Sequence, residues 1–421
     1  MISHKIPYGY GHLRFRLPDW IQPESVEIRK IPALPEPQAA VLEAISNPLG
    51  GISLSDFRGV RSVAIAINDK TRPVPNDQLL PPLLGHLEEL GVKPGAIQLI
   101  IATGTHPRML PLEYPLIAPQ EILDRFPVHC HHCDDSESLV YLGTTSRDTP
   151  VWINQLFAEA DLRIVVGIIE PHQFQGFTGG VKGAAIGLAG RDTINHNHSL
   201  MTSPKACLGR YSDNPARQEI EEIGQIIGVH FSLNAILNSD RQIVAVIAGD
   251  PCAVMEKGIP LSRQISQVQV DERFDLIIAS PGGYPKDINL YQSQKALAHA
   301  GKITRMGGTV ILAAACAEGT GSRAYELWMN GISSHQEAIE RFQREGFLVG
   351  PHKAVQIAID ATRVKIILIS ELESSFVRKL LLTPATSINE ALETALVDLP
   401  ADANVGIMPQ ASSTIPFVKS K

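Results

Sequence analysis

The chain has 421 residues, 44% of them hydrophobic and 19% charged, and a formal net charge of -7. At about 150 residues per domain the chain should hold two or three domains, and we take two as the working count. The acidic balance argues against a nucleic-acid surface and favours a small-molecule partner. No apolar run is long enough to span a bilayer, and the polar stretch 1–13 does not resemble a secretion signal, so we expect a cytoplasmic protein without membrane contact.

Along the chain, short apolar runs that end in polar residues or glycine predict buried parallel strands. They are residues 63–67, 97–102, 164–169, 276–279, 310–314 and 364–369. Helical stretches such as 78–90 and 291–300 lie between them, and Ser387 with Glu390 predicts a capped helix that runs to Val397. The alternation predicts an α/β protein built from two mixed α/β domains.

A polar stretch at 262–273 separates a histidine-bearing first part from a second β/α series. We therefore place an N-terminal α/β domain at 1–268 and a C-terminal α/β domain at 269–400. Residues 401–421 include strand-forming residues, and we interpret them as a tail that returns to the N-terminal domain.

Polar residues and glycines follow four of the predicted strands, where open α/β sheets bind ligands. These segments are 68–73, 103–106, 170–172 and 280–285. If the four strands share the expected layers, Asp69, Arg72, His106 and His172 meet at one rim. A single histidine at a strand end is more often a capping or solvent-facing residue, but this combination favours a site.

Residues 170–199 form the densest polar and glycine-rich segment, which also contains Lys182, His196 and His198. A phosphate-binding P-loop is excluded because Val181 precedes Lys182 and Gly183 stands where Ser or Thr should be. The dinucleotide fingerprint G-x-G-x-x-G is absent as well. Two interpretations of the glycines stay open, which are close approach to a bound group and tight packing without a ligand.

The string His129-Cys130-His131-His132-Cys133 resembles a metal site, because it contains C-x-x-C. A structural zinc ion needs four ligands, usually as two separated pairs, and no second pair lies nearby. We interpret the string as a short strand that runs into a loop.

Together, these segments resemble the nickel-dependent lactate racemases and their 2-hydroxy-acid racemase and epimerase relatives. The matching motifs are Asp69–Pro73, Ala102–His106, Glu170–His172, Gly176–Lys182, Asn197–Ser199 and Gly282–Pro285, with Asp287, Tyr291, Gln292 and Lys295. Their order and spacing make the resemblance specific, with ten residues from His172 to Lys182 and sixteen from Lys182 to His198.

The resemblance implies an isomerase that inverts C2 of a lactate-like 2-hydroxy acid, with its active site in the cleft between the domains. It implies nickel and a nickel-pincer nucleotide of the pyridinium-3,5-bisthiocarboxylic acid mononucleotide type. Lys182 would hold this cofactor covalently through a thioamide, and His198 would be the protein ligand of nickel. His106 and His172 would act as alternating acid and base.

The resemblance also implies further binding residues. Asp69, Lys70, Thr71 and Arg72 would bind the cofactor, and Arg72 would also contact the substrate. On the second domain, the substrate-binding residues would be Tyr291, Gln292 and Lys295. Val181 and Gly183 depart from the family pattern, which has Arg and Ser there. His196 is an additional histidine, interpreted as a surface residue or as support for the metal ligand.

The chemistry agrees with these roles. The C2 hydrogen beside an ionised carboxylate is poorly acidic, whereas hydride transfer to an electron-poor pyridinium requires only that a base take the hydroxyl proton. Histidine suits that task because its pKa lies near the working pH. A fixed cation such as Arg72 or Lys295 can bind the carboxylate, and sulfur donors with imidazole favour nickel or copper.

Two other functions stay open from the sequence. A zinc-type metal-dependent hydrolase could use His106, His172 and His198, although it would need a further ligand beside the metal. A non-catalytic binding protein could also retain this fold.

Overall fold

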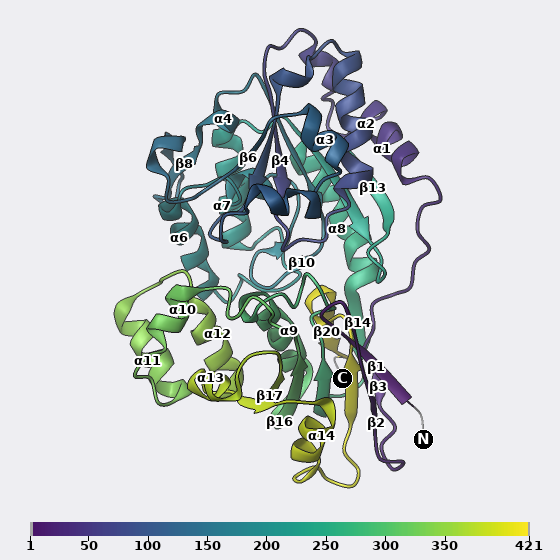
Figure 1. Ribbon diagram of the computed structural model, residues 1–421, viewed down its shortest axis with the longest axis vertical. Coiled ribbons are helices and arrows are strands. Elements are labelled where there is room, and N and C mark those ends of the chain that lie inside the picture. Colours follow the sequence, from purple (N-terminus) through teal and green to yellow (C-terminus); the bar gives the residue numbers. More distant parts are fainter. Residues whose placement is uncertain (1–2, 420–421) are drawn as a thin grey trace. The chain divides into compact units, whose positions relative to one another are not determined.

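The computed structural model describes residues 3–419, which form two compact units (Figure 1). The central unit comprises residues 29–265, and the terminal unit joins residues 3–28 to residues 266–419. The terminal unit resumes at Ser266, three residues before the predicted start of the C-terminal domain at residue 269. The assignment of residues 3–28 to the N-terminal domain was wrong, because β3 (Glu24–Ser25) pairs with a strand of the terminal unit.

The central unit is built on one six-stranded sheet of order β13-β12-β9-β4-β5-β6. All pairs are parallel except β12 with β13. The strands are β4 (Val63–Asn68), β5 (Ile97–Ala102), β6 (Val128–Cys130), β9 (Leu162–Ile168), β12 (Phe231–Leu237) and β13 (Ile243–Gly249). Successive side chains of a strand point to opposite faces, so both faces of this apolar sheet need a cover.

Helices cover both faces of the central sheet (Figure 1). On one face lie α1 (Pro37–Ser46), α2 (Asn76–Glu89) and α3 (Gln120–Arg125), packed against Ile65 and Ile67 of β4. On the other lie α4 (Gln155–Ala158), α5 (Lys182–Ala185), α6 (Arg191–Ser199) and α7 (Pro215–Ile227), packed around Ala64 and Ala66. Two small hairpins, β7–β8 (Leu139–Thr144, Pro150–Asn154) and β10–β11 (Pro171–His172, Gly176–Phe177), and α8 (Pro251–Ser266) complete the unit.

The terminal unit contains a second six-stranded sheet, entirely parallel, of order β18-β17-β16-β15-β19-β3. Its remaining strands are β15 (Phe274–Ala279), β16 (Thr304–Ala313), β17 (Lys365–Ile369), β18 (Thr383–Ala385) and β19 (Val405–Met408). One face packs on α9 (Leu290–Ile303), α10 (Arg323–Trp328), α11 (His335–Glu345), α12 (Pro351–Ala361) and α13 (Ser374–Lys379). The other face packs on the hairpin β1–β2 (Ser3–Tyr8, Gly11–Arg16) and α14 (Ile388–Leu396).

The α/β class and the predicted strands are confirmed, but the tail does not return to the central unit. β19 is buried between β15 and β3, and β20 (Ile415–Val418) pairs with β14 (Gln267–Val270). An entirely buried strand needs a hydrogen-bonded neighbour on each side, and β19 finds both in the terminal unit.

The predicted cap of α14 is present in a modified form. Ser387 Oγ accepts a hydrogen bond from the backbone N–H of Glu390 at 3.1 Å. The Glu390 carboxylate turns to Thr386, whose N–H and hydroxyl donate to it at 2.7 and 2.6 Å. Both ends of the capping pair therefore satisfy groups at the helix start.

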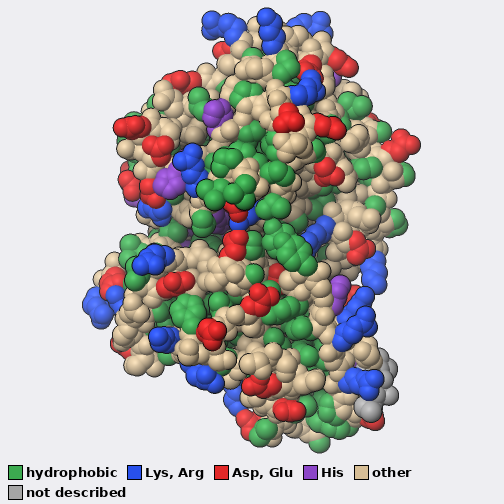
Figure 2. All heavy atoms as spheres, viewed as in Figure 1, with side chains coloured by type: hydrophobic (Ala, Val, Ile, Leu, Met, Phe, Trp, Pro, Cys, Tyr) green, Lys and Arg blue, Asp and Glu red, His purple; other side chains and the backbone are tan. Residues whose placement is uncertain are grey.

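Among residues 3–419, no helix has the length and apolar character needed to cross a membrane. On the face shown in Figure 2, Lys and Arg side chains are interspersed with Asp and Glu.

Candidate functional site

Three adjacent strands of the central sheet bring most of the predicted site residues to one edge. In the order β9-β4-β5, the carboxyl ends lead into Glu170–His172, Asp69–Arg72 and Thr103–His106. The fourth predicted segment, residues 280–285, follows β15 and therefore lies at the corresponding edge of the second sheet. Because β15 belongs to the terminal unit, the four strands do not share one sheet, and the meeting of this last segment with the other three stays a prediction.

Asp69 and His106 form a short hydrogen-bonded pair at this edge. Asp69 Oδ2 lies 2.6 Å from His106 Nδ1, and the Asp69 side chain is buried. Its other oxygen, Oδ1, accepts hydrogen bonds from the hydroxyl of Thr71 at 2.6 Å and from its N–H at 3.0 Å. Burial by itself raises the pKa of Asp69, but His106, Thr71 and Arg72 outweigh it and hold that pKa below its usual range. Asp69 is therefore an ionised carboxylate that orients His106.

Lys70 forms an ion pair with Glu113, which lies outside the segment Asp69–Arg72. Its Nζ lies 2.6 Å from Glu113 Oε1, and this bond holds the pKa of Glu113 below its usual range. Glu113 belongs to a 3-10 turn at Pro111–Leu116, which continues the loop that carries His106. Lys70 thus ties the segment after β4 to the segment after β5.

His172 lies in the β10–β11 hairpin, where it pairs with Gly176 and is 7% exposed. The backbone N–H of Gln175 donates to His172 Nδ1 at 3.2 Å. A Cβ on Gly176 would fall 1.8 Å from the carbonyl oxygen of Arg210, and its φ is +75°. Only glycine allows this backbone conformation and this close approach, so the turn that holds His172 requires glycine at position 176.

Phe174 connects the second predicted histidine to the predicted metal ligand. Its ring meets that of His172 at 5.0 Å and that of His198 at 5.1 Å, both edge to face. Phe174 is 4% exposed and packs with Ala206 and Ala216. One buried aromatic ring therefore separates His172 from His198, which α6 carries.

Lys182 is the first residue of the short helix α5, and protein atoms occupy the space where a Cβ would stand on the glycines around it. A Cβ on Gly180 would meet Met255 at 2.7 Å, and one on Gly183 would meet Val165 at 2.7 Å. The tight-packing interpretation of these glycines is therefore the one the structure favours. The same contacts account for the departures from the family pattern, since Ser at 183 would collide with β9 and Val181 packs closely against Gly224 of α7.

The end of the Lys182 segment lies beside the loop of His106. The N–H of Gly104 donates to the carbonyl oxygen of Gly187 at 2.9 Å. This bond brings the segments after β5 and β9 together in the central unit.

Buried polar residues to which the sequence analysis gave no role hold this segment in place. Arg217, 1% exposed on α7, donates to the carbonyl oxygens of Phe177 and Gly179, both at 3.2 Å. Asn234 Oδ1 accepts from the N–H of Gly180 at 2.8 Å. Asn197 bridges Gln175 and Ala216, at 3.0 and 2.8 Å. No sequence signal identifies Arg217 or Asn234, because isolated Arg and Asn are usually surface residues. Asn197 lies in a motif of the resemblance, which assigned it no role.

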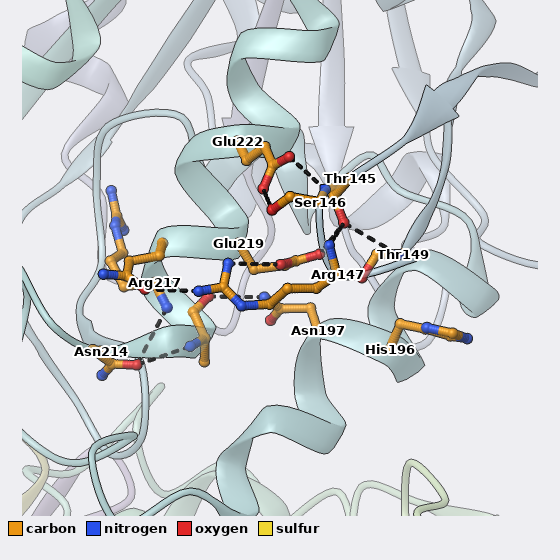
Figure 3. Close-up of polar contacts among 12 residues, drawn as sticks. Thr145, Ser146, Arg147, Thr149, His196, Asn197, Asn214, Arg217, Glu219 and Glu222 are labelled. Carbon is orange, nitrogen blue, oxygen red and sulfur yellow. Dashed lines mark hydrogen bonds and ion pairs between the residues drawn. The ribbon is translucent and has the colours of Figure 1, made fainter.

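Figure 3 shows the contacts that α7 makes through Glu219 and Glu222 with residues 145–147. Glu219 is fully buried and accepts from the hydroxyl of Thr145 at 2.5 Å and from Arg147 at 3.3 Å. Glu222 accepts from the hydroxyl of Ser146 at 2.7 Å. In the same view His196 is exposed and points away from Asn197, which agrees with the surface interpretation of His196.

The substrate residues predicted for the second domain lie together on α9 of the terminal unit. Lys295 Nζ donates to Gln292 Oε1 at 2.6 Å, and Gln292 is 3% exposed. Tyr291 has Lys353 Nζ 4.8 Å from its ring centroid. Asp287 binds backbone instead, since its Oδ2 accepts from Gly9 at 2.6 Å. That Tyr291, Gln292 and Lys295 share a site with the central unit stays a prediction.

The string 129–133 has separate structural partners. His131 is 1% exposed and its Nε2 contacts the carbonyl oxygen of Ala189 at 3.0 Å, while burial lowers its pKa to about 4. Cys133 accepts from Arg191 at 3.4 Å. Over residues 3–419, no three or more His, Cys, Asp or Glu side chains are grouped to hold a metal ion. The zinc-hydrolase alternative therefore lacks the ligand set it needs.

Comparisons with known proteins cover almost the whole chain. Residues 8–209 match the lactate racemase N-terminal domain, and residues 269–415 match the lactate racemase C-terminal domain. The lactate racemase of Thermoanaerobacterium thermosaccharolyticum is 30% identical over 426 residues, which cover 99% of each chain. That of Lactiplantibacillus plantarum is 32% identical over 308 residues, 72% of each chain.

Solved structures also match almost the whole chain. The lactate racemase apoprotein from Thermoanaerobacterium thermosaccharolyticum superposes with a TM-score of 0.89 at 29% identity, covering 100% of both chains. A Thermotoga maritima protein, 19% identical, gives a TM-score of 0.69 over 91% of this chain and shares the fold.

Proposed function

The chain belongs to the lactate racemase family and is an isomerase of the racemase type, and from that premise we propose that it inverts C2 of a 2-hydroxy acid such as lactate with a nickel-pincer nucleotide. The observation that carries the proposal is the convergence at one sheet edge. There Asp69 and His106 follow β4 and β5, and His172 follows the neighbouring strand β9 and is linked through the Phe174 ring to His198 of α6.

The donor set supports this cofactor. In the proposal His198 contributes one imidazole, and the part of the chain that is described groups no further His, Cys, Asp or Glu into a metal site. A metal held here would take its other ligands from the cofactor, whose sulfur atoms together with imidazole suit nickel. Lys182 offers the primary amine that a thioamide requires. When bound, the cofactor would supply an electron-poor ring that takes the C2 hydrogen as hydride and returns it.

The protein residues would manage the proton and the carboxylate. His106 and His172 exchange the hydroxyl proton of the two enantiomers, and Asp69 orients His106. Arg72 beside Asp69, and Lys295 on α9, are the cations assigned to the substrate carboxylate. Asp69, Lys70 and Thr71 would surround the cofactor.

Deuterium at C2 tests the proposal. Protein loaded in a host that makes the cofactor is incubated with each lactate enantiomer carrying deuterium at C2, in ordinary water. Hydride return predicts slower racemisation and a product that retains its deuterium, because a hydride never mixes with solvent protons. Rapid loss of deuterium to water would falsify the hydride step and favour direct proton abstraction.

The covalent link is tested separately. We expect the peptide that contains Lys182 to carry an adduct of the cofactor's mass in loaded, active enzyme and to lose it in Lys182→Ala. Lys205→Ala, an exposed lysine of the same unit, serves as the matched control and should keep the adduct. An active enzyme with an unmodified Lys182 peptide would contradict the assignment.

A further inference from the structure

We propose that His106 and His172 rest in opposite tautomers, with the ring proton of His106 on Nδ1 and that of His172 on Nε2. The carboxylate of Asp69 and the backbone N–H of Gln175 act as the positioning groups. The tautomers follow from the central unit alone, and only their catalytic meaning rests on the proposed function.

For His106 the argument begins with Asp69. An ionised carboxylate accepts hydrogen bonds and cannot donate them. Asp69 Oδ2 lies 2.6 Å from His106 Nδ1, so this nitrogen must donate. The hydroxyl of Thr71 is committed to Asp69 Oδ1 at 2.6 Å, which leaves Oδ2 to His106. The neutral ring of His106 therefore carries its proton on Nδ1 and has the lone pair on Nε2.

For His172 the group beside Nδ1 is a hydrogen-bond donor, whereas the group beside Nδ1 of His106 is an acceptor. A backbone N–H donates only, and that of Gln175 lies 3.2 Å from His172 Nδ1. Nδ1 therefore accepts, and the proton of the neutral ring lies on Nε2.

Gln175 is held so that its N–H keeps this direction. Its side chain is fully buried, and Nε2 donates to Asn197 Oδ1 at 3.0 Å. Its carbonyl oxygen accepts from the N–H of Phe177 at 2.9 Å. Asn197 in turn donates to the carbonyl oxygen of Ala216 on α7. The turn that sets the tautomer of His172 is thus tied to the helix that carries His198.

The two histidines would enter the reaction unequally. His106 can take a hydroxyl proton on Nε2 directly and becomes an imidazolium whose Nδ1–H stays on Asp69. His172 presents a proton on Nε2, so it must first move that proton to Nδ1 and give up the bond from Gln175 before it can act as a base. The resting enzyme is therefore prepared for the enantiomer whose hydroxyl faces His106.

Nitrogen NMR of the full chain without cofactor tests the inference. Protein labelled with ¹⁵N in its histidine rings is measured above the titration range of the rings, and His106→Gln and His172→Gln assign the two signals. We expect a protonated Nδ1 in His106 and a protonated Nε2 in His172. The same tautomer in both rings, or the reverse pair, would overturn the inference.

Asp69→Asn gives a second, directional test. Both donors of Thr71 hold Oδ1, so the side-chain oxygen of Asn should stay there and its NH₂ should face His106 Nδ1. We expect His106 to switch to a protonated Nε2 while His172 is unchanged. Asp134→Asn, which removes a carboxylate paired with Arg191 in the same unit, should leave both rings as they are.

These spectra require neither nickel nor turnover, so they can fail while the deuterium experiment succeeds, and the reverse. In loaded enzyme, Asp69→Asn should lower the racemisation rate by about 10²-fold or more, the usual range for a positioned acid or base. An unchanged His106 tautomer in Asp69→Asn would refute the role given to Asp69.

Discussion

Arg217 donates a hydrogen bond to the carbonyl oxygen of Gly179, which lies 38 residues earlier in the chain and three positions before Lys182. The same guanidinium binds Glu221 at 2.6 Å and is 1% exposed, so it is almost completely removed from water. A buried cation costs free energy unless it is paired and hydrogen-bonded, and here each of the three guanidinium nitrogens donates to Glu221 or to a carbonyl oxygen. Arg217 therefore links the stability of α7 to the geometry of the Lys182 segment.

The first prediction is that Arg217→Met destabilises the central unit. Removing one partner of a buried pair takes the cationic donor away from two carbonyl oxygens and from Glu221, which keeps the Tyr211 hydroxyl at 2.8 Å. We expect a loss of about 3–5 kcal/mol in the free energy of unfolding. Urea denaturation measures it. Adding Glu221→Gln should recover part of the loss, since the uncompensated charge is then gone.

The control for this prediction is an exposed pair. Lys365 and Asp398 lie 2.7 Å apart, with side chains 61% and 71% exposed. Lys365→Met should cost no more than about 1 kcal/mol, because water screens surface pairs. Equal losses for Lys365→Met and Arg217→Met would contradict the importance assigned to burial.

The strands were predictable because buried parallel strands are continuous apolar runs. The predicted strand 97–102 coincides with β5, and the predicted strand 63–67 ends one residue before the end of β4. The residues at the ends of these strands were predictable for the same reason, since adjacent parallel strands place Asp69 and His106 at one edge.

What the sequence did not reveal depends on contacts between distant residues. No local sequence feature indicates that Arg217 or Asn197 is buried, and the space beside Gly183 of α5 is limited by Val165 on β9. The tail was misplaced because strand-forming residues show that a strand forms and not which neighbour it pairs with. β19 pairs with β15, about 130 residues earlier in the chain.

The second prediction concerns Phe174. Phe174→Leu removes the two edge-to-face contacts with His172 and His198, so we expect loaded protein to retain less nickel, as we expect of His198→Ala. Metal analysis of purified protein measures it. Phe157→Leu is the matched control, because Phe157 is fully buried in another core cluster of the same unit and should lower stability without lowering nickel content. Equal nickel in Phe174→Leu and wild type would contradict the positioning role.

The third prediction is a pH dependence that His131 causes. Its folded pKa of about 4 lies below the unfolded value near 6.5, so between these two pH values the unfolded chain binds the proton and the folded chain does not. Stability should therefore fall as the pH drops from about 6.5 to about 4, by up to roughly 3 kcal/mol from this residue.

Urea denaturation at several pH values measures the effect. His131→Gln retains a donor for the carbonyl oxygen of Ala189 but does not titrate, so its stability should change less over this window. The same dependence in His131→Gln and wild type would assign the effect to other groups.

The fourth prediction concerns Gly183, where the family pattern has Ser. The Cβ of Ser at this position would lie 2.7 Å from Val165 Cγ1, and Val165 is 2% exposed in the middle of β9. A well-packed core cannot yield that space freely, so Gly183→Ser should cost about 1–3 kcal/mol in the free energy of unfolding.

Val165→Ala removes the opposing methyl group and should leave a small cavity when made alone. In the double variant the Ser side chain occupies that cavity, so the combined loss should be smaller than the sum of the two single losses, by about 0.5–3 kcal/mol. Losses that simply add would show that Gly183 is required for a reason other than its contact with Val165.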